Sequence, residues 1–234
     1  MEDKTTDMPS ADASEEAGLP PLWQRLLDAF FNPGKMGEYL AANPAWFSAL
    51  LVVGVIIGFQ FFLIPPEVFE AVQREAALEA GREPPEMSEA ALGVIRLVTP
   101  IFAIISTMLF TCIFAGIYTF VFAFILGDEG KFKQYLSILA HASIITAVVG
   151  LAMTPFRIST SNPQLTVNMA SFFFFLEDGY LIGVLTAIDL SQVWATLIVA
   201  MGATKIDSQR SFGSAAGVLL GFVLVIALIV GRFI

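Results

Sequence analysis

AWFSALLVVGVIIGFQFFLI, residues 45–64, is a run of twenty residues without a charged side chain. As an α-helix it covers about 30 Å, which is the thickness of the hydrocarbon core of a bilayer. Pro65 and Pro66 follow directly, and proline at this position ends a helix. The stretch therefore predicts a membrane-spanning helix and, around it, a membrane protein.

The composition of the whole chain favours the same class. Of its 234 residues 56% are hydrophobic, 22 are Phe and only 14% are charged. A soluble domain of this length has too little interior to bury that much apolar surface. The net charge is −9 and no basic stripe is present, so we expect no nucleic-acid partner. With one histidine, His141, and one cysteine, Cys112, we expect neither a metal cluster nor another cofactor.

Four further apolar segments follow the first one. We predict an all-α integral membrane protein whose residues 45–234 form a five-span helical bundle. The predicted spans are residues 45–64, 97–126, 135–155, 188–204 and 214–231. Five spans place the termini on opposite sides of the membrane. With the N-terminus inside, the cytoplasmic segments hold seven Lys and Arg and the other segments five, so the positive-inside rule predicts a cytoplasmic N-terminus.

Two segments precede the bundle. Residues 1–21 hold six acidic residues and one basic residue, and we predict a disordered tail. Residues 22–44 are predicted to lie at the membrane interface, beginning with a short amphipathic helix whose polar face carries Arg25 and Asp28. Its opposite face carries the apolar side chains Leu22, Trp23, Leu26, Leu27, Phe30 and Phe31. We expect Trp23, Phe30 and Phe31 to contact the bilayer interface. The alternative is that the helix packs against another part of the protein.

Glycines recur at four-residue spacing in two of the predicted spans. Gly54 and Gly58 lie in the first, and Gly213, Gly217 and Gly221 lead into the fifth. Such faces let two helix backbones approach closely. We expect them to pack within the bundle, and the alternative is contact between copies in a homo-oligomer.

Two ionisable residues lie inside apolar segments. A carboxylate in hydrocarbon is costly, and Asp189 stands directly before the fourth apolar helix, with Gln192 three residues later. This spacing predicts an N-cap. The alternatives are a bridge to Arg96 or Arg157, or a substrate or ion site. We expect His141 to lie about 15 Å from Asp189 in depth, which argues against a proton-transfer pair.

Three segments of the chain carry a family resemblance: FFNPGKMGEYLAANPAWFSAL (residues 30–50), GDEGKFKQYLSILAHASI (127–144) and IDLSQVWATLIVAMGATKI (188–206). The third is the most specific, with Asp189, then Trp194 five residues later, and small residues near Gly202. Together they resemble the Yip (Ypt-interacting protein) domain family in its prokaryotic branch, over residues 29–230. The resemblance implies a five-span fold. Eukaryotic members of that family bind prenylated Rab-type GTPases and organise vesicle membranes.

Two classes of function are compatible with these patterns. The first is a non-catalytic membrane scaffold or adaptor that binds the bilayer and so far unidentified protein partners. The alternative is a transporter, channel component or permease accessory subunit, which would need a polar cavity joining several of Asp189, Gln192, Tyr118, Thr111, Ser143 and His141. No catalytic motif appears in the sequence, so an enzyme is not expected. The acidic tail and the charge balance indicate a bacterial chain, and we expect the bacterial inner membrane as its location.

Overall fold

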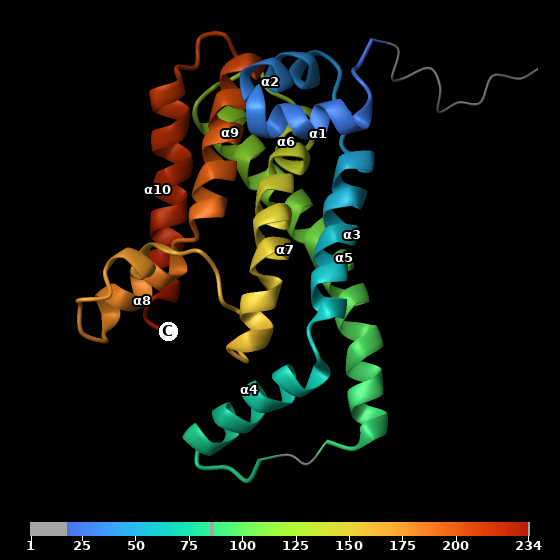
Figure 1. Cartoon of the computed structure of the whole chain (residues 1–234). Coiled ribbons are helices and arrows are strands. Elements are labelled where there is room, and N and C mark those ends of the chain that lie inside the picture. Colours follow the sequence, from blue (N-terminus) through green and yellow to red (C-terminus); the bar gives the residue numbers. More distant parts are fainter. Residues whose placement is uncertain (1–17, 85–86, 234) are drawn as a thin grey trace, which may run out of the picture.

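The computed structural model describes residues 18–84 and 87–233, and in these the chain is helical (Figure 1). Most of the predicted disordered tail, residues 1–17, lies outside the described residues. The elements are α1 (Leu22–Phe31), α2 (Pro33–Ala42), α3 (Phe47–Leu63), α4 (Pro66–Glu79), α5 (Glu89–Thr119), the π-helical η1 (Phe120–Ile125), α6 (Phe132–Ala142), α7 (Ile144–Ser159), the 3₁₀ turn η2 (Met169–Phe172), α8 (Tyr180–Ala187), α9 (Leu190–Ile206) and α10 (Phe212–Val230).

The described residues contain three to four candidate membrane spans. α5 with η1, α6 with α7, and α10 are each long and apolar enough to cross a bilayer. α3 also qualifies when it is joined with α4, from which it is bent by 76°. α9 is apolar but has only 17 residues, which give about 26 Å and lie at the lower limit for a span. The all-α prediction is therefore confirmed, whereas the count of five spans is not.

Several helices differ from their predicted limits. The second predicted span, 97–126, starts eight residues earlier at Glu89, because the Ser88 side chain accepts a hydrogen bond from Ala91 N (3.2 Å) and caps the helix there. The third, 135–155, extends over 132–159 and is interrupted at Ser143. The segment before the fourth span forms α8, and the chain is extended at Ile188 and Asp189 before α9 begins.

The helix α1 lies across the bundle near the end that also carries α2 (Figure 1). Its polar face points into the protein, where Arg25 is 1% exposed and Asp28 is 6% exposed. Trp23 and Phe31, on the apolar face, are 65% and 76% exposed. The polar face of α1 thus packs against the protein while its apolar face is directed outward. The sequence analysis had given packing on protein and an interfacial position as alternatives.

The core lies between α2, α6 and α9, with α3 and α5 packed beside it. Two glycines permit close approach of helices. A methyl group at Gly202 of α9 would lie 2.5 Å from Ile138 Cγ2 of α6, and one at Gly58 of α3 would lie 2.7 Å from Ile104 Cγ1 of α5. Larger side chains at these positions would force the helices apart.

A buried ion pair joins two connections at the α1 end of the bundle. Arg210, between α9 and α10, donates to both carboxylate oxygens of Asp128, whose side chain is 3% exposed. The hydrogen bond to Asp128 raises the pKa of the Arg210 guanidinium above its usual value. The guanidinium carbon of Arg210 also lies 5.9 Å from the centre of the Phe122 ring. The pair therefore fixes the end of η1 against the start of α10.

Candidate functional site

An elongated cavity of about 650 Å³ lies between α3, α5, α7 and α10. Its walls are mainly aromatic and aliphatic, with hydroxyl groups between them. The lining residues with polar side chains are Thr99, Ser106, Thr107, Thr111, Tyr118, Ser143, Thr146 and Gln192. We call it the inner cavity. The transporter alternative requires a polar cavity that joins several of six residues, and four of these six line the inner cavity: Thr111, Tyr118, Ser143 and Gln192.

Most of these hydroxyl groups are bonded within their own helix. Thr107 donates to Ala103 O and Thr111 to Thr107 O, each at 2.8 Å. Ser143 donates to Leu139 O at 2.8 Å, and Thr146 donates to Ser143 O at 2.9 Å. A hydroxyl that donates to its own backbone offers little to a ligand beyond its remaining lone pairs. The inner cavity is consequently suited to apolar rather than ionic contents.

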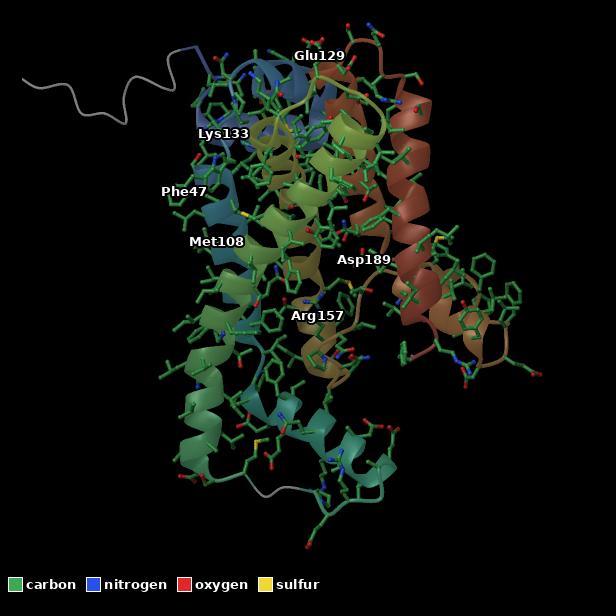
Figure 2. The ribbon with its side chains drawn as sticks, turned by 180° about the vertical axis from the view of Figure 1, so that it is seen from behind. Phe47, Met108, Glu129, Lys133, Arg157 and Asp189 are labelled. Atoms are coloured by element: carbon green, nitrogen blue, oxygen red, sulfur yellow. The ribbon has the colours of Figure 1, made fainter. Side chains whose placement is uncertain are left out.

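A second cavity of about 450 Å³ adjoins the first and carries the charged groups. It is lined by Gln60, Arg157, Asp189, Ser191 and others, and it shares Ile57, Phe61, Thr146 and Gln192 with the inner cavity. We call it the vestibule. Figure 2, which views the molecule from behind, shows Asp189 and Arg157 between the α5 side and the α10 side.

Asp189 is the N-cap of α9. Its Oδ1 accepts hydrogen bonds from Ser191 N (2.7 Å), Ser191 Oγ (2.6 Å) and Gln192 N (3.3 Å). The backbone before the helix is held by Asn168, with which Asp189 forms an antiparallel bridge. Gln192 takes part in the cap through its backbone N–H. In the described residues its side chain forms no hydrogen bond to the cap. These contacts fix the carboxylate at the edge of the vestibule.

Arg157, near the end of α7, shares the vestibule with Asp189 without forming an ion pair with it in the described residues. Its Nε donates to Leu165 O (2.9 Å) and its Nη1 to Gln60 Oε1 (3.3 Å). It is close enough to Asp189 for an electrostatic interaction. The opposite charges therefore face one cavity without neutralising each other by direct contact.

Gln60 is a site residue that the sequence reading missed. It is 4% exposed, and its Nε2 donates to Ala147 O of α7 at 2.8 Å. Gly150 makes room for it, since a methyl group there would lie 2.6 Å from Gln60 Oε1. The sequence did contain an indication of this role, because Gln60 is the one amide side chain within the apolar residues 45–64.

The other predicted polar residues lie outside both cavities. His141 is fully buried, and its Nδ1 lies 2.8 Å from Ser137 O. The Arg96 guanidinium lies over the Phe62 ring, 5.4 Å from its centre. Trp194 packs edge-on against Phe30 with ring centres 5.8 Å apart. Phe30 is thus half-buried on α9 rather than directed outward like Phe31.

The two glycine faces differ. Gly54 and Gly58 pack against Ile104 inside the bundle. A methyl group at Gly213, Gly217 or Gly221 would meet no described atom within 4 Å. The glycine face of α10 therefore makes no close contact with another helix in the described residues.

A second polar cluster lies beneath α1 and α2. The Asp28 carboxylate accepts from Asn32 Nδ2 and from the Tyr39 hydroxyl, each at 3.2 Å, and Arg25 Nη2 donates to Ser48 Oγ at 3.4 Å. Burial raises the pKa of the Tyr39 phenol, and the adjacent Asp28 carboxylate raises it further. The cluster holds α1 by its polar face.

The sequence pattern of the Yip1 domain matches residues 27–231, almost the whole described chain. The chain belongs to the Yip1 domain family. The match confirms the resemblance seen in the sequence, and it includes the residues that line both cavities as well as Asp28, Asn32 and Tyr39 of the second polar cluster. Neither a curated protein nor a solved structure matches this Yip1 domain chain significantly.

Proposed function

We propose that this Yip1 domain protein is a non-catalytic membrane scaffold or adaptor that crosses the bilayer five times. The proposed crossings are α3, α5–η1, α6–α7, α9 and α10, which alternate in direction along the chain (Figure 1). Figure 2 shows Lys133 at the α1 end, where Lys205 pairs with Glu38 of α2. Lys131 and Arg210 lie in the connections at the same end, and these four basic residues support a cytoplasmic N-terminus and an opposite C-terminus. The proposed location is the bacterial inner membrane.

The orientation of α1 carries the proposal. In water, an amphipathic helix buries its apolar face, because exposed apolar area and buried charge are both unfavourable. Here Arg25 and Asp28 are buried, whereas Trp23, Leu27 and Phe31 are exposed. This arrangement is favourable where the surroundings are lipid at headgroup depth. The bundle thus holds α1 in a position where its apolar face displaces lipid in one leaflet. Such displacement changes the shape of the membrane, and the altered membrane can then recruit protein partners.

Reconstitution into vesicles tests this function. We expect the full-length protein to reduce vesicle diameter at a fixed protein-to-lipid ratio, as measured by cryo-electron microscopy. The variant Trp23→Ser, Leu27→Ser, Phe31→Ser keeps the buried face of α1 and should return the diameter to that of protein-free vesicles. A matched control places Ser at Lys35, Ala42 and Asn43, which are exposed in or just after α2. Equal diameters for wild type and the α1 variant would contradict the proposal.

Transport remains the second candidate function, because the inner cavity and the vestibule meet at Gln192. A transport role requires a Gln192→Leu variant that folds normally but fails to complement a deletion strain. Full complementation by that variant would remove the transport candidate and leave the scaffold.

A further inference from the structure

The inner cavity is long enough to hold a lipid acyl chain. It is lined along α5 from Thr99 to Tyr118, and nineteen helical steps rise about 28 Å. One leaflet of a bilayer has a hydrocarbon depth of about 15 Å. The cavity therefore extends further along α5 than one acyl chain requires, and its volume of about 650 Å³ lies within the range of ligand sites.

The same cavity is bordered by residues that face outward. Phe102 and Phe110 of α5 are 68% and 56% exposed, and Ile226 of α10 is 37% exposed. Toward the α1 end, Phe222 of α10 packs against Phe114 and Tyr118, with ring centres 6.3 and 6.4 Å away. The cavity is thus closed by aromatic rings at one end and bordered by lipid-facing side chains elsewhere, so a lipid can enter from the bilayer between α5 and α10.

The vestibule supplies a polar end of mixed charge. The described hydrogen bonds of Arg157 use Nε and Nη1, and those of Asp189 all use Oδ1. Within the described chain, Arg157 Nη2 and Asp189 Oδ2 thus have no hydrogen-bond partner. One cationic donor and one anionic acceptor are therefore left for a ligand in the same cavity.

We propose that the inner cavity and the vestibule form one binding site for a zwitterionic, amine-bearing phospholipid of the phosphatidylethanolamine type. Its phosphate accepts from Arg157, its ammonium group donates to Asp189, and an acyl chain occupies the inner cavity. A guanidinium is a preferred donor to phosphate. A lipid with a phosphate but no amine would leave the Asp189 carboxylate facing a second anion, which is unfavourable.

Native mass spectrometry of the detergent-solubilised full-length protein tests the proposal. The probes are phosphatidylethanolamine, phosphatidylglycerol, and glycerophosphoethanolamine, which has the headgroup but no acyl chain. We expect phosphatidylethanolamine to bind at least tenfold more tightly than either of the other two. This comparison uses the wild-type protein alone, so it does not depend on whether a variant folds.

Three variants locate the site. Ser106→Phe fills the inner cavity and should abolish binding, and Arg157→Gln should weaken it at least tenfold. Asp189→Asn retains an N-cap oxygen and should remove the preference for phosphatidylethanolamine over phosphatidylglycerol. The matched control is Arg96→Gln, since Arg96 lies on α5 outside both cavities, and it should bind like wild type.

Four results would overturn the proposal: equal binding of the two phospholipids, tighter binding of phosphatidylglycerol, undiminished binding of glycerophosphoethanolamine, or wild-type binding by Ser106→Phe. None of these depends on the effect of α1 on vesicle diameter, so failure here is distinguishable from failure of the scaffold function.

Discussion

At the scale of single residues, the position of Asp189 follows from local chemistry. The N–H groups at the start of a helix need acceptors, and below the membrane surface water does not supply them. Asp189 provides an acceptor to the backbone of Ser191 and Gln192. Such a cap is readable from sequence because all its partners lie within three residues. The pairing of Arg157 with Gln60 is not, because it joins residues 97 positions apart.

Substitutions at Asp189 separate capping from charge pairing. Asp189→Asn keeps an acceptor oxygen, so we expect almost unchanged thermal stability in detergent. Asp189→Ala should cost about 1 kcal/mol of unfolding free energy, and Asp189→Leu should be no better despite its greater apolarity. A strongly destabilised Asp189→Asn would instead show that the carboxylate charge, paired with Arg157, holds the structure.

The Arg210–Asp128 and Lys205–Glu38 ion pairs, both at the α1 end, should differ in their contribution to stability. Arg210→Gln leaves the Asp128 carboxylate buried without its cation, and such a loss costs roughly 3–5 kcal/mol. The matched control is Lys205→Gln, whose partner Glu38 has a side chain that is 62% exposed, and it should cost at most about 1 kcal/mol. Denaturant unfolding of the two variants measures the difference, and equal losses would show that the burial of Asp128 is not what makes its pair strong.

At the scale of elements, the sequence predicted where most helices lie, but not that α1 packs its polar face against the bundle. The periodicity of residues 22–31 gave α1 as an amphipathic helix, and its polar face is buried. Periodicity shows that a helix has a polar and an apolar face. Which of the two faces is buried in the protein depends on whether lipid or water surrounds the helix. The start of α5 at Glu89 was missed because Ser88 caps the helix in a polar segment ahead of the apolar run.

Glycine faces provide a test at this scale. Gly58→Leu would bring side-chain atoms against Ile104 and against the Pro100 carbonyl oxygen, which lies 3.1 Å from an added methyl group, so we expect a loss of about 1–3 kcal/mol. A methyl group at Gly217 would meet no described atom within 4 Å, so Gly217→Leu should leave the stability of the monomer unchanged. Size-exclusion chromatography with light scattering then reports whether the open α10 face joins two copies, since in that case Gly217→Leu should shift a dimer to a monomer. Equal destabilisation by both variants would contradict the packing described for α3 and α5.

At the scale of the whole molecule, hydrophobicity and loop charge predicted a helical membrane protein and an alternating path for the chain. The cavity was not predictable, because it arises from the spacing of α5 and α10, where Phe222 contacts the rings of Phe114 and Tyr118. The shortest of the proposed crossings are α3 and α9, whose 17 residues each span about 26 Å. If α9 did not cross, both ends of this helix would lie on one side.

Cysteine labelling in whole cells tests the five crossings most directly. In a Cys112→Ser background, single cysteines replace Glu83, Lys131, Ser161 and Ser208, and each variant is treated with a membrane-impermeant maleimide before and after permeabilisation. We predict that the cysteines at 83 and 161 react in intact cells, and that those at 131 and 208 react only after permeabilisation. Reaction of the cysteine at 208 together with that at 161 in intact cells would contradict a crossing by α9.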